Sequence, residues 1–190
     1  MPVDKRNIIL VGMPAVGKST VGVLLAKRLR YNFIDTDISI QVENDATLEE
    51  LIARYGNDHL LELEAKVLDS IVPARCVVAT GGSAVYSTQP MRHLRATGPV
   101  VYLRVAFDEV ERRVGDLTKR GVIVPPGFTF RDLYDQRCTL YEFCADVVVD
   151  TTGRSVEESV DLVADAVSDY LERTLPRDER PWEPMAPSVD

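Results

Sequence analysis

The sequence predicts an α/β protein in which helices cover a five-stranded parallel sheet. Five short apolar runs, rich in β-branched residues, alternate with longer segments whose apolar residues recur at helical spacing. This alternation is typical of parallel strands joined by helical crossovers. The length of 190 residues and the hydrophobic fraction of 45% fit one globular domain with its own core.

In the first half of the chain, strands are expected at residues 7–12, 32–35 and 76–80. The first of them, NIILVG, is a continuous apolar run of the kind found in strands buried on both faces. Helices are expected at 18–29 and 47–71, because leucines and other apolar residues recur there at helical spacing. The second helix is interrupted near Gly56.

In the second half, strands are expected at residues 99–105 and 145–150, and helices at 89–95, 107–117, 130–144 and 155–171. The last helix has a continuous apolar stripe, formed by Val156, Val160, Val163, Ala164, Val167 and Leu171. Residues 174–190 contain four prolines and no periodicity, which predicts a mostly disordered tail after a single domain of residues 1–173.

Composition excludes several classes of protein. Lys and Arg number 22 against 30 Asp and Glu, and the net charge of −8 argues against a nucleic-acid binder held by bulk charge. No apolar run approaches the roughly 18–20 residues of a membrane span, and the first residues do not resemble a secretory signal. Three scattered cysteines and two distant histidines favour neither disulfides nor zinc. We expect a cytoplasmic monomer without nucleic-acid or membrane partners.

Residues 12–19, GMPAVGKS, match the phosphate-binding P-loop pattern G-x-x-x-x-G-K-[ST] between an expected strand and an expected helix. Glycines allow backbone N–H groups to converge on phosphate, and the helix N-terminus adds partial positive charge. Lys18 is expected to reach the β- and γ-phosphates, and the Ser19 hydroxyl to bind Mg²⁺. The expected ATP-binding residues here are Gly12, Ala15, Val16, Gly17, Lys18, Ser19 and Thr20.

The rest of the sequence narrows the class of P-loop protein. We find no N-K-x-D guanine signature, and the third strand ends in Thr80-Gly81-Gly82 rather than in the acids of a Walker B strand. Both observations favour a small kinase of nucleosides or metabolites over a GTPase or a motor.

Asp35 and Asp37 follow the second strand, where the carboxyl ends of parallel strands face the ligand. One carboxylate can hold a water of the Mg²⁺ shell while the other accepts the proton of a substrate hydroxyl. The alternative is that Asp37 caps the N-terminus of a following helical turn.

Gly81, Gly82 and Ser83 follow the third strand, where free N–H groups can bind a carboxylate or a phosphate. An ordinary tight turn explains these residues equally well.

Five blocks together resemble the shikimate kinase family over about residues 7–171: GMPAVGKST, FIDTD, ATGGSAV, the basic segment 112–120, and QRCTLYEFCADVVVDT. The resemblance implies a three-layer P-loop NTPase fold with strand order 2-3-1-4-5. It also implies a lid at about 119–130 and a substrate-binding helical region at about 37–71. The implied reaction is the phosphorylation of a shikimate hydroxyl by ATP with Mg²⁺.

The resemblance also implies roles for single residues. Lys18, Asp37 and Arg120 would be catalytic, with Arg120 reaching the phosphates from the lid. Ser19 and Asp35 would serve the metal, and Arg113 would stack on adenine. Gly81, Gly82 and Arg137 would contact the substrate, with the guanidinium of Arg137 on its carboxylate. For a lone arginine on a helix, however, a solvated surface charge is the commoner role.

The acceptor half departs from the family pattern at three positions. Leu61 stands where the family has a second carboxylate-binding arginine, Ser83 replaces a third glycine, and Gly121 follows the first lid arginine in place of proline. An altered acceptor is therefore an alternative, with homoserine the leading candidate because Glu62 or Glu64 could bind its ammonium group. A third alternative is an inactive ATP-binding module.

Overall fold

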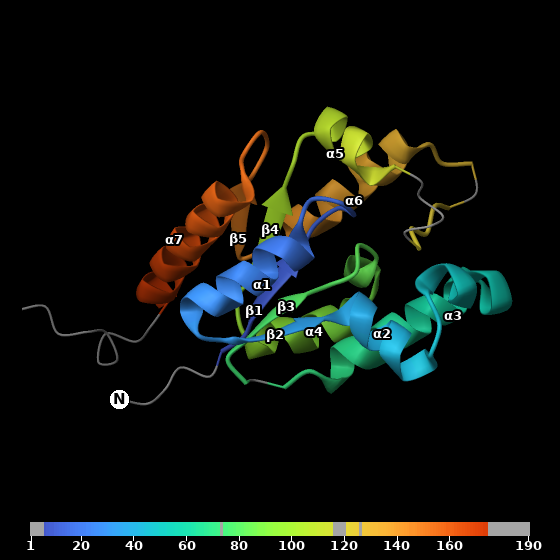
Figure 1. Cartoon of the computed structure of the whole chain (residues 1–190), viewed down its shortest axis with the longest axis horizontal. Coiled ribbons are helices and arrows are strands. Elements are labelled where there is room, and N and C mark those ends of the chain that lie inside the picture. Colours follow the sequence, from blue (N-terminus) through green and yellow to red (C-terminus); the bar gives the residue numbers. More distant parts are fainter. Residues whose placement is uncertain (1–5, 73, 116–120, 126, 175–190) are drawn as a thin grey trace, which may run out of the picture.

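The computed structural model describes residues 6–72, 74–115, 121–125 and 127–174. Five parallel strands form one sheet in the order β2-β3-β1-β4-β5, as predicted (Figure 1). The strands are β1 (Ile8–Val11), β2 (Asn32–Asp35), β3 (Cys76–Ala79), β4 (Val100–Arg104) and β5 (Val147–Asp150). Central β1 and β3 are buried at every residue, which explains their continuous apolar sequences.

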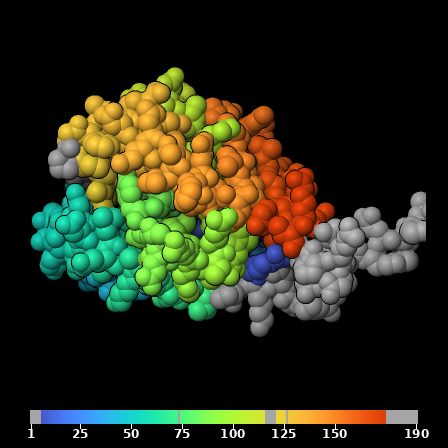
Figure 2. Space-filling model, turned by 180° about the vertical axis from the view of Figure 1, so that it is seen from behind, coloured from blue at the N-terminus to red at the C-terminus, as the bar shows by residue number. Residues whose placement is uncertain are grey.

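Helices cover both faces of the sheet. On one face lie α1 (Lys18–Leu29) and α7 (Val156–Thr174), which pack on each other (Figure 1). On the other face lie α4 (Thr88–Thr97) and α6 (Phe130–Cys144), and the short 3-10 helix η1 (Ala84–Tyr86) lies beside them. Figure 2 shows this side of the molecule, where α3 (Leu48–Ser70), α4 and α6 form the surface. The three-layer arrangement confirms the predicted fold class.

One helix, α2 (Thr36–Asn44), was not predicted as a separate element. Its apolar residues Ile38, Ile40 and Val42 alternate, a pattern that favours a strand. Only Ile40 is buried, whereas Ile38 and Val42 are exposed, so the alternation does not mark a sheet face. The helix is fixed instead at its start, where the Asp35 carboxylate accepts hydrogen bonds from the N–H groups of Asp37 and Ile38.

The helical region formed by α2 and α3 projects beyond the β2 edge of the sheet (Figure 1). The predicted interruption at Gly56 is confirmed, since this residue has φ 83° and ψ 174° inside α3. The region has its own small apolar core, formed by Ile40, Ala46, Leu51, Leu60, Val67 and Ile123. Ile123 comes from the predicted lid segment, so part of that segment packs against the helical region.

Helix α5 (Phe107–Val114) is shorter than predicted and ends at Gly115. Arg120, most of the tail and the beginning of the predicted lid lie outside the described residues. Within the described ranges, no helix is both long and apolar enough to cross a membrane.

Candidate active site

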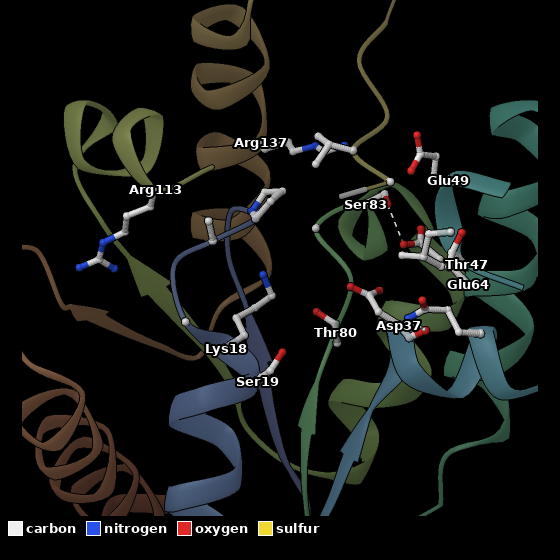
Figure 3. Close-up of a pocket in the computed structure, with 18 of the residues that line it drawn as sticks. Lys18, Ser19, Asp37, Thr47, Glu49, Glu64, Thr80, Ser83, Arg113 and Arg137 are labelled. Atoms are coloured by element: carbon white, nitrogen blue, oxygen red, sulfur yellow. Dashed lines mark hydrogen bonds between the residues drawn. The ribbon is translucent and has the colours of Figure 1, made fainter. Parts of the chain in front are cut away.

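A cavity of about 590 Å³ opens at the carboxyl ends of β1, β2 and β3, between the loop before α1 and the helical region (Figure 3). In Figure 3, Arg113 lies to one side of Lys18, and Asp37, Glu64 and Ser83 lie to the other. The lining residues come from segments far apart in the sequence: Pro14, Ala15, Gly17, Lys18, Ser19, Thr20, Asp37, Gln41, Thr47, Leu48, Glu49, Glu64, Thr80, Gly82, Ser83, Arg113, Gly121, Val122 and Arg137.

The loop before α1 has the backbone of a phosphate cradle. Ala15 and Gly17 both have positive φ, 65° and 99°, and Gly17 caps α1. The Lys18 Nζ donates hydrogen bonds to the carbonyl oxygens of Gly12 and Met13, at 2.7 and 2.9 Å. Burial lowers the pKa of Lys18 to about 8, although the nearby Asp37 carboxylate opposes the shift. The loop therefore places a buried cation beside the backbone N–H groups at the N-terminus of α1.

The two aspartates after β2 have different roles, and the helix cap is Asp35 instead of Asp37. Asp35 caps α2 through its Oδ1, 3.0 Å from the Asp37 nitrogen, so the expectation that Asp37 is the cap was wrong. Asp37 lies in the first turn of α2 with its carboxylate in the cavity, where its buried Oδ1 has no hydrogen-bond partner among the described residues. Burial raises the pKa of Asp37 to about 6, against the opposing charge of Lys18. Such a carboxylate is suited to accept a proton near neutral pH.

The chain after β3 forms the floor of the cavity. Its position is fixed by Thr80, whose N–H and hydroxyl both donate to the carbonyl of Leu10, and by Gly81, whose N–H donates to the hydroxyl of Thr36. A Cβ on Gly81 would stand 2.4 Å from Glu64 Oε1 and 2.8 Å from Asp37 Oδ1. The absence of a side chain at Gly81 therefore allows two carboxyl groups to converge there.

This close approach gives a prediction for Gly81→Ala. Gly81 does not have a positive φ, so the backbone accepts alanine, but the new Cβ displaces both carboxyl groups. We expect acceptor-dependent kcat/KM to fall roughly a hundredfold, because small displacements of reacting groups cost about that much. Binding of Mg-ADP, measured by calorimetry, should change little, and an equal loss of Mg-ADP binding would contradict this account.

Arg137 is buried, with 1% of its surface exposed, so the solvated-charge alternative was wrong. Its Nη2 donates to the carbonyl of Ile123 at 3.0 Å and its Nε donates to the Tyr86 hydroxyl at 3.2 Å. Its Nη1 would lie 3.0 Å from a Cβ on Gly82. A buried guanidinium held in this way is a ready partner for a carboxylate.

Arg113 lines the opposite end of the cavity. It forms an ion pair with Glu109 one turn earlier in α5. The other oxygen of Glu109 accepts a hydrogen bond of 2.8 Å from the N–H of Gly153, which follows β5. The ion pair can be predicted from the sequence, because Glu109 and Arg113 are four residues apart on one helix. No sequence pattern predicts the contact between Glu109 and Gly153.

Several expected residues lie elsewhere. Leu61 is not among the lining residues and packs against the apolar core of the helical region. The Glu62 side chain is 79% exposed and faces His59, so of the two glutamates proposed to bind an ammonium group only Glu64 reaches the cavity. Gln41, Thr47 and Glu49 also line the cavity and were not predicted. Thr47 and Glu50 form a capping box that signals the start of α3 in the sequence, but no motif signals that these polar side chains face a cavity.

The site fits Mg²⁺ bound together with nucleotide phosphates. Among the described residues, no cluster of three or more His, Cys, Asp or Glu side chains can hold a metal ion. Mg²⁺ in phosphoryl-transfer sites is commonly held by one or two protein oxygens, phosphates and water. The Ser19 hydroxyl lies at the start of α1 inside the cavity. The carboxylate of Asp37, whose Oδ1 has no hydrogen-bond partner among the described residues, lies near the charge of Lys18.

The phosphate cradle opens directly onto a buried carboxylate and a buried arginine, and this arrangement is that of a P-loop kinase with a small-molecule acceptor. The family model described as "Shikimate kinase" matches residues 14–168. The chain therefore belongs to the shikimate kinase family. It is an ATP- and Mg²⁺-dependent phosphotransferase with an alcohol group as acceptor.

Individual relatives agree with the family model. The chain is 38% identical to shikimate kinase of Geobacter metallireducens over 174 residues, which are 90% of this chain and 94% of the relative. Shikimate kinase of Acinetobacter baumannii, solved in complex with shikimate, is 29% identical with a TM-score of 0.77, covering 90% of this chain and 96% of its own. The solved shikimate kinase of Aquifex aeolicus is 25% identical with a TM-score of 0.76, and the match covers 85% of this chain and 96% of the Aquifex chain. These relatives do not favour the homoserine alternative or an inactive binding module.

Proposed function

We propose that this protein phosphorylates shikimate. The observation that carries the proposal is the buried Arg137 beside Gly82, with the unpartnered Asp37 Oδ1 beside Gly81 in the same cavity. An acceptor whose carboxylate binds Arg137 can then present a hydroxyl to Asp37, in front of the phosphate-binding loop. The names of the relatives, and the shikimate bound in the Acinetobacter structure, support this acceptor.

In the proposed reaction, the acceptor hydroxyl oxygen attacks the γ-phosphorus of ATP and its proton passes to Asp37. The new O–P bond forms as the bond between the γ-phosphorus and the bridging oxygen breaks, and ADP leaves with the bridging oxygen. Lys18 and the N–H groups of the loop stabilise the charge that develops on the phosphates. Ser19, and Asp35 through water, would hold Mg²⁺, which would supply further charge neutralisation.

Two further roles are proposed from the family resemblance. Arg113 stacks on adenine at the end of the cavity away from Asp37, in agreement with its position in Figure 3. Arg120, which lies outside the described residues, reaches the phosphates from the lid. We also propose that the protein acts as a cytoplasmic monomer without nucleic-acid or membrane partners; its free cysteines agree with a reducing compartment.

A panel of acceptors tests the proposal. ADP release is measured by a coupled assay with ATP, Mg²⁺ and either shikimate, homoserine or gluconate. We expect acceptor-dependent ADP release with shikimate alone. Release with homoserine and not with shikimate would overturn the proposal, and so would release that no acceptor accelerates.

A further inference from the structure

Glu64 is a buried acid in the acceptor half of the cavity, with only 4% of its surface exposed. Its Oε1 accepts a hydrogen bond of 2.8 Å from the Ser83 hydroxyl, drawn as a dashed line in Figure 3. Its Oε2 is buried and has no hydrogen-bond partner in the part of the chain that the structure describes. Buried oxygens are rarely left unpaired, so Oε2 is the atom of this side chain that is available to a ligand.

The same carboxyl group lies beside the proposed position of the acceptor carboxylate. Glu64 Oε1 approaches Gly81, and Arg137 Nη1 approaches the next residue, Gly82. Consecutive Cα atoms are about 3.8 Å apart, so the Glu64 carboxyl group and the Arg137 guanidinium lie beside adjacent residues of the segment after β3. Ser83 completes this floor and holds Glu64 by its other oxygen.

The charges around Glu64 determine which protonation state can accept an anionic ligand. Of the described residues, Lys18 of α1 and Arg137 of α6 act on it as cations, and Asp37 of α2 acts on it as an acid. Glu49, at the start of α3, adds another carboxylate to the cavity wall. At position 61, three residues before Glu64, the chain has a leucine packed in an apolar core. An ionised Glu64 would therefore repel the carboxylate of an acceptor.

We propose that Glu64 binds the acceptor as a neutral acid: a proton on its Oε2 is donated to one oxygen of the acceptor carboxylate, while Arg137 binds the other. Ser83 orients Glu64 for this contact by donating to Oε1. When Glu64 is ionised in the free enzyme, binding of the acceptor takes one proton from the solvent. The inference rests on the proposed function, since it assumes that shikimate is bound by its carboxylate.

The titration of the free enzyme agrees with this assignment. Burial raises the pKa of Glu64 to about 7, and the like charge of Asp37 adds to the shift, while the Ser83 hydrogen bond opposes it. A bound carboxylate raises the pKa further, because it stabilises the protonated form. Proton uptake should then appear above neutral pH and vanish well below it.

Calorimetric titration tests the proposal. Shikimate is titrated into the full-length protein at about pH 8.5, where the free carboxyl is mostly ionised, in two buffers with different enthalpies of ionisation. We expect uptake of about one proton per shikimate, and a Kd that rises up to about tenfold per pH unit above pH 7. Glu64→Gln retains the shape and always carries a donor, so it should bind without proton uptake and with a Kd that changes little with pH.

Three controls separate the outcomes. Glu62→Gln makes the same change two residues away on an exposed side chain and should retain the proton uptake. Ser83→Ala should weaken binding and also retain the uptake, because the titrating group is still present. Melting temperature and Mg-ADP affinity show whether each variant is folded.

Wild-type binding without proton uptake would overturn the inference, as would uptake that persists in Glu64→Gln. In either case turnover of shikimate would leave the proposed function standing. A protein that neither binds nor phosphorylates shikimate would overturn both.

Discussion

Replacement of Lys18 by alanine is expected to lower kcat by roughly a thousandfold or more, because the change removes a preorganised charge that acts on the transition state. The fold should persist, because burial of the Lys18 side chain is itself unfavourable and lowers its pKa to about 8. Within the described part of the chain, its hydrogen bonds go to the carbonyls of its own loop. The measurement is the steady-state kcat together with circular dichroism.

Lys27→Ala is the matched control for this variant. Lys27 is an exposed residue in the last turn of the same helix, so its replacement removes the same charge far from the cavity. Near-normal kcat is expected for Lys27→Ala. A folded Lys18→Ala variant with near-normal kcat would show that phosphoryl transfer does not take place at this loop.

Replacement of Asp37 by asparagine is expected to lower kcat by about a hundredfold to ten-thousandfold, the usual contribution of a positioned general base. An amide retains the size of the side chain but cannot take up the hydroxyl proton. Affinity for ATP should change much less than kcat, because Asp37 lies on the acceptor side of Lys18 (Figure 3). Steady-state kinetics with both substrates varied would separate the two effects.

Asp45→Asn makes the same chemical change at the other end of α2. Asp45 has a left-handed backbone conformation at the C-terminus of this helix, a conformation that asparagine also accepts. We expect little change in kcat for this control. If Asp37→Asn lost ATP binding and retained kcat, Asp37 would serve the metal and not the proton transfer.

The sequence was sufficient to predict most of the sheet and the phosphate-binding half of the site. Continuous apolar runs identify strands buried on both faces, and the P-loop glycines and lysine are consecutive in the chain. Helix α2 falls within the helical region expected at about 37–71, but it was not predicted as a separate helix. Its alternating Ile38, Ile40 and Val42 resemble a strand, and the residue that starts the helix, Asp35, is itself the end of β2.

The acceptor half could be predicted only in part, because tertiary contacts determine it. Arg137 was identified as a site residue only by the family resemblance, and burial is what separates it from a surface charge. Ser83 was interpreted as a departure from a glycine pattern, whereas the structure pairs it with Glu64, which lies 19 positions earlier in the chain. No local periodicity encodes a contact of that kind.

The identity of the product shows directly whether the protein phosphorylates shikimate. The protein is incubated with ATP, Mg²⁺ and shikimate, and the mixture is followed by phosphorus NMR. We expect a new phosphomonoester resonance from shikimate, which grows in step with ADP and is absent with the Lys18→Ala variant. ADP that accumulates without a phosphorylated shikimate, or an unchanged ATP spectrum, would contradict it.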